Sequence, residues 1–160
     1  MDRKHILQRG FTLVELLIVV VIMVVIGTAG IVKLLRTHRV NALKVEANHI
    51  VAELRLTINR AEAQENSSQW GIHFENPGGG DDFYQVWYGS DYTSGIKEEL
   101  IYLPATVVFS GDLVTSGSSK DIVFEKATGL PTTAETITIQ SMGSSNIIAI
   151  SINSYGKIDF

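Results

Sequence analysis

The uncharged apolar run from Leu16 to Val32 constrains this chain more than any other feature. It reads LLIVVVIMVVIGTAGIV, and extending it to residues 11–35 adds only two charged side chains, Glu15 and Lys33. A helix needs about 20 apolar residues to cross the hydrocarbon core of a bilayer, and in lipid a helix satisfies its own backbone. Val and Ile favour strands, but strands rarely exceed about eight residues. We therefore expect residues 11–35 to form a membrane-spanning helix rather than a buried helix of a soluble protein.

Basic residues before the apolar run predict its orientation. Arg3, Lys4 and Arg9 precede it, and only Asp2 opposes them. Cationic residues favour the cytoplasmic side, so we expect a single pass with the N-terminus inside and the residues after Val32 outside. An ordinary secretory signal peptide begins in the same way, but its apolar region is shorter and a small-residue cleavage pattern follows it.

Glu15 is a carboxylate a few residues inside the predicted span. A charge at the centre of a bilayer costs about 2.5–3.5 kcal/mol, and less near the end of the span. Glu15 either reaches the headgroups or finds a cationic partner. Lys33 lies 18 residues away in the sequence, about 27 Å along a helix, so it cannot be that partner within one helix. A cation must then come from another chain or from a newly made N-terminus.

The residues around Glu15 resemble the class III signal of type IV pilin-like proteins. The matching stretch is Arg9-Gly10-Phe11-Thr12-Leu13-Val14-Glu15, followed by the apolar run. The resemblance implies that a prepilin peptidase cleaves between Gly10 and Phe11 and that the Phe11 amine becomes N-methylated. It also implies that Glu15 pairs with the N-terminal amine of a neighbouring subunit during assembly. The partners implied are other pilin or pseudopilin subunits, the prepilin peptidase and the assembly machinery.

The segment after the span has helical periodicity. Apolar residues recur every three or four positions, and no proline occurs between Phe11 and Gln64, so we expect one helix over residues 11–64. The charged residues of residues 36–64 fall mostly off this apolar stripe, which predicts that this half packs on something. The stripe consists of Val40, Leu43, Ala47, Ile50, Val51, Leu54, Ile58 and Ala61.

From residue 65 onward, short β-rich runs alternate with turns rich in Gly, Ser and Asn. Thr136-Ile137-Thr138-Ile139-Gln140 alternates clearly, which is typical of a strand with one solvated face. We predict strands at residues 70–75, 83–88, 99–103, 106–110, 122–125, 136–140, 147–152 and 157–160. The fold class expected is therefore α+β: a long N-terminal transmembrane helix packed on an antiparallel sheet.

The β-rich half also resembles the GspH/FimT-type pseudopilin domain. The segments that carry this resemblance are Trp70-Gly71-Ile72, Val107-Val108-Phe109, Ile122-Val123-Phe124 with Gly129-Leu130-Pro131, Ile137-Thr138-Ile139, and Ile150-Ser151-Ile152-Asn153 with Gly156-Lys157-Ile158. The organisation that follows is a leader at 1–10, an assembly half of the helix at 11–35, an amphipathic half at 36–64 and the β-rich domain at 65–160.

Charge and composition argue against other classes of function. The chain has no cysteine, which excludes a disulfide framework and thiolate metal sites. Its net charge is −4, and because residues 1–10 carry +2, removing them leaves −6. Residues 66–160 contain only four cations, Lys97, Lys120, Lys126 and Lys157. Nucleic acid is therefore not an expected partner, because its binding requires a basic face.

Catalytic and metal motifs are not expected either. The sequence contains no G-x-S-x-G elbow, H-E-x-x-H helix or phosphate-binding glycine loop. His73 is the only histidine of the β-rich half, and a lone strand histidine is more often structural than catalytic. Asp81 and Asp82 offer oxygen atoms that suit calcium, but an acidic loop tip explains them as well. We expect no enzyme activity, no cofactor and no metal ligand.

Two functions are consistent with this sequence. The first is a structural subunit, a minor pilin or pseudopilin of a type IV pilus or a type II secretion pseudopilus. It would reside in the cytoplasmic membrane with its domain in the periplasm or outside the cell, and then enter the filament. The second is a membrane-anchored binding or enzymatic domain whose anchor is not cleaved.

Overall fold

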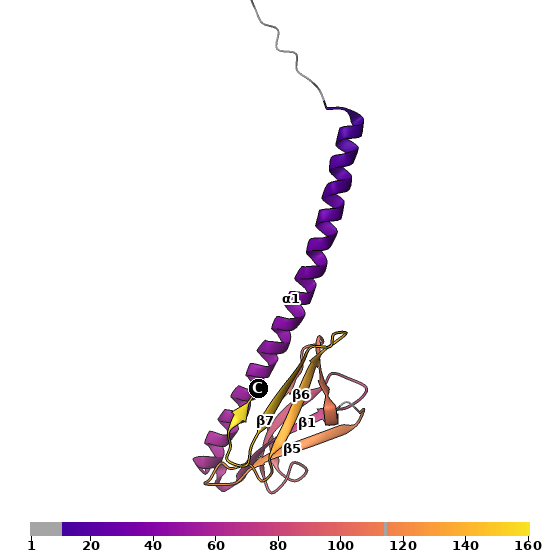
Figure 1. Cartoon of the computed structure of the whole chain (residues 1–160). Helices are drawn as coiled ribbons and strands as arrows, with labels where there is room; N and C mark the ends of the chain where they lie inside the picture. The colour runs from indigo at the N-terminus through magenta and orange to yellow at the C-terminus, as the bar shows by residue number, and fades with distance from the viewer. Residues whose placement is uncertain (1–10, 114) are drawn as a thin grey trace, which may run out of the picture. The chain divides into compact units, whose positions relative to one another are not determined.

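A computed structural model of the chain describes residues 11–113 and 115–160, apart from the side chains of residues 27–37. The chain divides into two compact units, residues 1–38 and 39–160. One helix, α1 (Leu13–Glu62), contains the boundary between them (Figure 1). Its extent agrees within two residues at each end with the helix expected over residues 11–64.

Local chemistry fixes both ends of α1. At the start, the hydroxyl oxygen of Thr12 accepts a hydrogen bond from the Glu15 N–H at 3.2 Å, and the Thr12 carbonyl accepts one from the Leu16 N–H at 3.2 Å. Thr12 is therefore an N-cap, which satisfies N–H groups that the helix cannot pair itself. At the other end, Gln64 adopts a left-handed backbone with φ of 57°, a conformation that stops helix propagation.

Within the described residues, no helix combines the length and the apolarity required to cross a bilayer. The span predicted over residues 11–35 includes side chains outside the described set, and it stays a prediction.

The described part of the chain after α1 contains two short 3-10 turns, Glu65–Ser67 and Gly111–Leu113, and eight strands. The predicted strands are all present, although β3 and β5 begin earlier than expected. Their bounds are β1 (Gln69–Asn76), β2 (Phe83–Gly89), β3 (Ile96–Tyr102), β4 (Val107–Ser110), β5 (Ser118–Phe124), β6 (Glu135–Ser141), β7 (Ile147–Ile152) and β8 (Ile158–Asp159).

The strands form two antiparallel sheets, whereas the sequence predicted one. The first sheet has the order β3-β2-β1-β5 and the second the order β4-β6-β7-β8. β5 returns to pair with β1, with Ile122 opposite Ile72, while β4 pairs forward with β6. An isolated bridge joins Phe124 at the end of β5 to Pro131 in the connection that leads to β6. Strand pairing between distant segments does not follow from alternation within each strand, which is why the sequence did not separate the sheets.

A single hydrophobic core joins α1 to both sheets. The α1 residues buried in it are Leu43, Ala47, Ile50, Val51, Leu54 and Ala61, with Ile58 packed at its margin. Six of the eight stripe positions expected from the sequence are therefore buried. Trp70 and Tyr84 belong to the same core, each with no more than 1% of its surface exposed.

Glu46 is the exception in this core. The sequence placed Glu46 off the apolar stripe, but only 4% of its surface is exposed. Burial raises the pKa of the Glu46 carboxyl group. Burial also raises the pKa of the Tyr84 hydroxyl group, and the charge of Glu46 adds to the effect.

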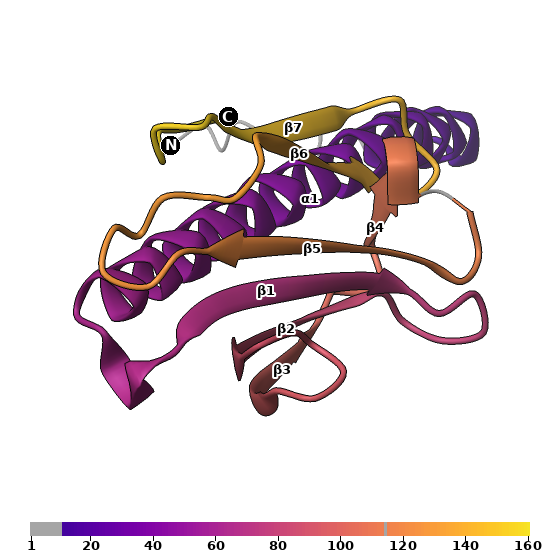
Figure 2. The same ribbon diagram turned by 90° about the horizontal axis from the view of Figure 1, so that it is seen from below.

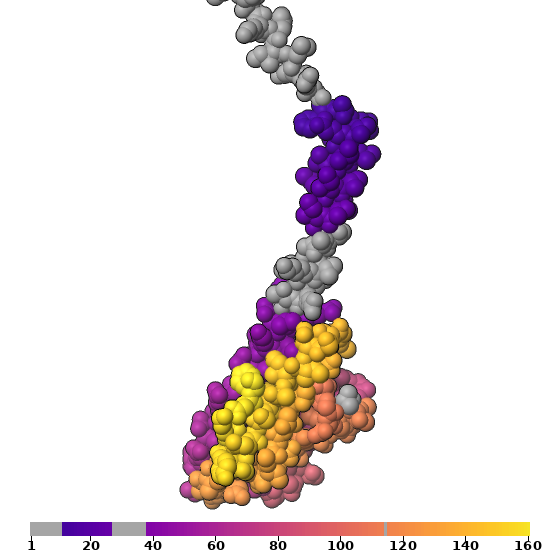
Figure 3. Space-filling model, in the orientation of Figure 1, coloured from indigo at the N-terminus to yellow at the C-terminus, as the bar shows by residue number. Residues whose placement is uncertain are grey.

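The sheets lie along the second half of α1. Seen from below, the ribbons of β6 and β7 lie on one side of this helix segment, and those of β1, β2 and β3 on the other (Figure 2). The space-filling view shows the C-terminal strands alongside the helix (Figure 3). At that junction an open hollow of about 260 Å³ is lined by Lys44, Asn48, Ile148 and Phe160. Because few polar groups converge on it, the hollow does not resemble a substrate site.

Candidate functional site

The N-terminal end of α1 carries the residues that the sequence singled out. Gly10 lies outside the described residues. Phe11 precedes the helix with 80% of its surface exposed, Thr12 caps the helix, and Glu15 lies in the first turn. Phe11 and Glu15 therefore lie within one helical turn of each other, at the end where α1 begins.

Glu15 has a local role as well as the predicted one. The pattern Thr12-Leu13-Val14-Glu15 is a capping box, in which the residue three positions after the cap is acidic or Gln. The unpaired N–H groups of a helix start carry partial positive charge, so a carboxylate there stabilises the helix by about 0.3–1 kcal/mol.

The apolar side chains after Glu15 lack cover within the described chain. From Leu16 to Ile26, every residue is apolar and between 43% and 69% exposed. The exposed positions occur in succession, so they surround the helix rather than forming a stripe. An apolar surface of this kind is covered by lipid or by other protein chains.

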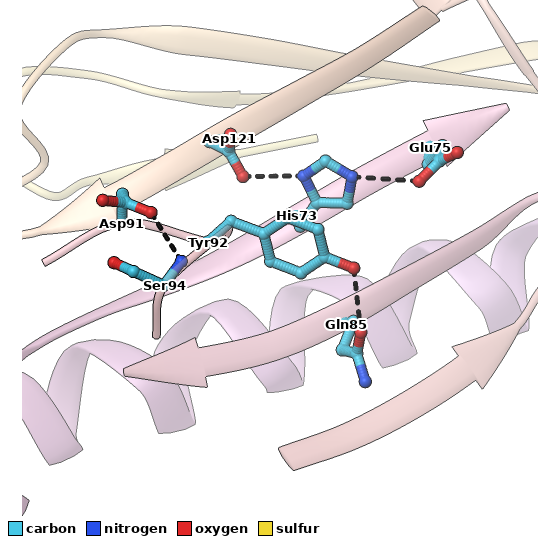
Figure 4. Close-up of polar contacts among 7 residues, drawn as sticks. All are labelled: His73, Glu75, Gln85, Asp91, Tyr92, Ser94 and Asp121. Carbon is cyan, nitrogen blue, oxygen red and sulfur yellow. Dashed lines mark hydrogen bonds and ion pairs between the residues drawn. The ribbon is translucent and has the colours of Figure 1, made fainter. Parts of the chain in front are cut away.

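A polar cluster lies around His73, on the face of β1 opposite the core. His73 Nδ1 lies 2.8 Å from Asp121 Oδ1, and His73 Nε2 lies 3.2 Å from Glu75 Oε2 (Figure 4). β5 pairs Asp121 directly beside His73, and Glu75 follows two residues along β1. His73 is only 5% exposed, so this polar group is buried with its partners around it.

Tyr92 covers His73 from the connection between β2 and β3. The two rings stack with centroids 3.7 Å apart and an interplanar angle of 4°. The Tyr92 hydroxyl donates to Gln85 Oε1 at 2.9 Å, and Lys97 Nζ lies 4.1 Å above the Tyr92 ring. Burial raises the pKa of Tyr92, and the Glu75 and Asp121 carboxylates add to this effect.

The turn that carries Tyr92 is held by Asp91. Asp91 Oδ1 accepts a hydrogen bond from the Ser94 N–H at 2.8 Å, and this bond lowers the pKa of the carboxyl group (Figure 4). Beneath the turn, Gly71 faces the Trp87 ring, and a Cβ at Gly71 would lie 2.6 Å from it. The outer face of the sheet thus holds a second aromatic cluster, which closes over His73.

Both ring nitrogens of His73 are engaged by carboxylates of neighbouring strand residues. No serine, threonine or cysteine side chain is bonded to His73 in the described part of the chain. The structural role expected for His73 stays a prediction.

Asp81 and Asp82, the two candidate oxygen ligands for calcium, have different environments. Asp82 is buried, and its Oδ2 accepts a hydrogen bond from the Phe109 N–H at 2.6 Å, so it ties β2 to β4. Burial raises the pKa of Asp82. Asp81 is exposed. Across residues 11–113 and 115–160, no three acidic or histidine side chains are grouped to hold a metal ion.

Comparison with known proteins gives one match. Residues 7–31 match the family described as the prokaryotic N-terminal methylation motif. The match includes Gly10, Phe11 and Glu15. The motif indicates a pilin-like subunit that a prepilin peptidase processes. No curated protein and no solved structure matches the chain significantly.

Two features of this chain escaped the sequence reasoning. The cap by Thr12 had a local signal, because Thr-x-x-Glu before an apolar run marks a helix start. The partnership of His73 with Asp121 had no such signal, because these residues lie 48 positions apart and meet only through the pairing of β1 with β5.

Proposed function

We propose that this chain is a non-catalytic structural subunit, a minor pilin or pseudopilin of the GspH/FimT type. Peptidase cleavage after Gly10 and N-methylation of Phe11 prepare it for assembly into a type IV pilus or a type II secretion pseudopilus. Before assembly it resides in the cytoplasmic membrane as a single-pass protein with its β-rich domain outside. Its partners are the assembly machinery and other subunits of the same class.

The observation that carries this proposal is the exposed apolar surface of α1 directly after the processing motif. Residues Leu16–Ile26 present apolar side chains on all sides of the helix. Such a surface is stable in lipid, and it is equally stable among similar helices. A helix that can exchange one environment for the other suits a subunit that leaves the membrane to enter a filament.

Glu15 favours the move of the helix from the membrane into the filament. A carboxylate in the apolar segment destabilises the membrane state by about 2.5 kcal/mol or less near the end of the span. Pairing with the terminal amine of a neighbouring subunit removes that cost, and charge-assisted hydrogen bonds are strong in an apolar environment. The pair therefore favours the filament over the membrane.

The N-terminus of the mature protein tests the processing step. We expect mass spectrometry to find a chain that begins at Phe11 and carries one methyl group. Gly10→Val should abolish cleavage, because the peptidase has to accommodate this position. Gly79→Val is the matched control, since a Cβ at Gly79 meets no atom within 4 Å. A mature chain that retains residues 1–10 would instead support a membrane-anchored domain with an uncleaved anchor.

Substitution of Glu15 tests the assembly step. Glu15→Gln keeps the shape and the capping chemistry of the side chain but removes its charge. We expect normal cleavage and a reduction of at least tenfold in the amount of the chain that sediments with filaments. Asp81→Asn, an exposed carboxylate outside the helix, is the control. Normal entry of the Glu15→Gln variant into filaments would exclude the charge pair.

A further inference from the structure

β8 covers only part of the edge of β7. It pairs with Ser151 and Ile152, at the end of β7. On the side away from β6, residues 147–150 have no strand partner within the described part of the chain. Alternate residues of an antiparallel strand direct both backbone groups to the same side, so two of these four residues present an unpaired N–H and C=O. We call residues 147–150 the open edge of the second sheet.

The open edge lacks the protection that the other sheet edges have. Charged side chains, short strands or cover normally prevent an edge from pairing with another chain. β3 contains three charged residues and β5 contains two, whereas three of the four residues of β4 are buried. β7 has the uncharged sequence IIAISI, and Ile147 is 55% exposed. An apolar edge of this kind is a template for an added strand.

The hollow between α1 and the C-terminal strands lies against the open edge. Its lining consists of Ile148 of the open edge, Phe160 directly after β8, and Lys44 and Asn48 of α1. β8, the yellow arrow beside α1 in Figure 1, shows how a strand packs here, because Ile158 lies opposite Ile152 and packs against the core. Side chains two residues apart in a strand point to the same face. A strand that continued this row would therefore place a side chain opposite Ile148, in the hollow.

Two cations border this region. Lys44 lines the hollow, and Arg39 reaches the turn between β6 and β7, where an added Cβ at Gly143 would lie 3.7 Å from its guanidinium. Neither cation has an ion pair among the residues that the structure describes, and Asp159 of β8 is already paired with Lys157 at 2.8 Å. Complementary charge on a binding partner therefore means carboxylates.

We propose that the open edge binds an extended segment of a different subunit of the filament, which joins the second sheet as a strand antiparallel to β7. An apolar side chain of this segment, opposite Ile148, enters the hollow. Carboxylates beside it pair with Lys44 and, at the far end, with Arg39. The inference rests on the proposed function for the source of the strand. A minor subunit has other subunits as its neighbours, so a different protein supplies the strand.

The added strand satisfies three features of the domain together. Its backbone pairs the free N–H and C=O groups of the open edge, its apolar side chain fills the hollow, and its acid compensates Lys44. Main-chain hydrogen bonds give such a contact its affinity, and the side chains at alternate positions give it specificity. Apolar and acidic side chains at alternate positions thus define the chemistry of the segment.

Hydrogen exchange of the full chain in detergent, followed by NMR, locates the added strand. The probe is the peptide acetyl-Ser-Thr-Val-Thr-Glu-Glu-Ser-amide, whose valine suits the hollow and whose glutamates follow it. We expect saturating peptide to slow exchange at least tenfold at the outward amides of residues 147–150. The amides of β3, the edge strand of the first sheet, should be unchanged. Protection at β3 in place of the open edge, or at neither edge, would overturn the proposal.

Charge reversal tests the role of Lys44, with binding measured by the fluorescence anisotropy of labelled peptide. Lys44→Glu should weaken binding at least tenfold, and a peptide with lysine in place of both glutamates should restore it. Lys126→Glu, at an exposed cation outside the hollow, is the control and should bind the original peptide within twofold of the natural chain. Equal weakening by the two variants would show only general attraction between charges, and it would contradict the proposal.

Filling the hollow tests the apolar contact. Asn48→Phe places a ring in the hollow from the side of α1, and we expect it to weaken peptide binding at least tenfold. Asn59→Phe is the matched control, because Asn59 is an exposed asparagine of the same helix, three turns away, that does not line the hollow. It should bind as the natural chain does. Undiminished binding by the Asn48→Phe variant would exclude the hollow from the contact.

Photo-crosslinking in assembled filaments identifies the source of the strand. The natural chain has no cysteine, so a benzophenone can be attached at Ala149→Cys alone, an exposed position of the open edge. We expect a product with a different processed subunit, joined through an extended segment that contains acid, and at least tenfold less of it from Lys126→Cys. A product of two copies of this chain, or one with a protein outside the filament, would overturn the proposal.

The N-terminal mass and filament entry of the same samples report the proposed function separately. A chain that begins at Phe11 and enters filaments, but neither binds the peptide nor gives the crosslink, contradicts the added strand and leaves the proposed function standing. An unprocessed chain contradicts the proposed function, and the peptide measurements still decide whether the open edge accepts a strand.

Discussion

The two halves of α1 bury their apolar side chains by different means. Between Leu43 and Ala61, a stripe of apolar residues is covered by the sheets of the same chain. Between Leu16 and Ile26, the apolar residues surround the helix and stay exposed. One half is a stripe because the sheets of the same chain cover one side of it, and the other half is apolar all round. Periodicity thus reports where the partner of a helix is located.

Each half also contains one glutamate in apolar surroundings. Glu46 is buried in the core of its own domain, where burial favours its neutral form. Glu15 lies at the start of the exposed apolar segment, where the next chain can supply a cation. The first lies inside its own domain, whereas the second lies in the exposed part of the helix.

The largest effect on stability should come from a substitution in the core that covers the second half of α1. Phe74 is fully buried, and Phe74→Ala should lower the free energy of unfolding of the domain by about 3–5 kcal/mol. Ile22→Ala, in the exposed segment, should change it by less than about 0.5 kcal/mol. Thermal unfolding of the full chain in detergent, followed by circular dichroism, measures both. A comparable loss in the Ile22→Ala variant would contradict the independence of the domain.

A smaller effect should come from the outer face of the first sheet. Asp121→Ala removes one of the two carboxylates beside His73, and we expect a loss of about 1 kcal/mol, since Asp121 is partly exposed. The near-ultraviolet signal of Tyr92 and Trp87 should change with it. Ser119→Ala, an exposed position on the same strand, is the control. An unchanged aromatic signal would show that Asp121 does not hold Tyr92 over His73.

The smallest effect should come from Glu46. Because its pKa is raised in the folded state, the folded chain binds the Glu46 proton more tightly than the unfolded chain does. The contribution of Glu46 to stability is then most favourable below its unfolded pKa and declines as the pH rises through the folded value. Glu46→Gln should therefore be more stable than the natural chain at pH 8, by about 0.5 kcal/mol, on the scale of one hydrogen-bonding group.

Unfolding at several pH values checks this prediction. The difference between the Glu46→Gln variant and the natural chain should narrow as the pH falls toward 4. If the stability difference between the two chains instead grew as the pH fell, Glu46 would be stabilised in its charged form.

The elements of this fold could be predicted because they depend on local periodicity. A long apolar run and spacings of three and four residues predicted α1, and β-rich runs separated by turn residues predicted all eight strands. The division into two sheets could not be predicted in this way, because it depends on which distant strands pair. The same holds for β3, whose early start at Ile96 depends on the bulge in its pairing with β2 between Gln85 and Trp87.

The candidate site also has one part that the sequence predicts and another that only the fold brings together. Gly10, Phe11 and Glu15 are adjacent in the sequence, so their pattern alone pointed to processing and assembly. The surroundings of His73 come from β1, β5 and the connection after β2, which meet only in the folded domain. Glu46 was misplaced for a related reason, because the sheets cover a wider arc of the helix than its apolar stripe.

By itself, the sequence determined that this chain has a long uncharged apolar segment and a methylation motif that overlaps its start. These are properties of consecutive residues, so they are recognised without any tertiary contact. Only the tertiary structure decided which side chains of α1 are covered and which strands lie at the edges of the sheets. Those outcomes depend on which distant strands pair and on how the sheets cover the helix.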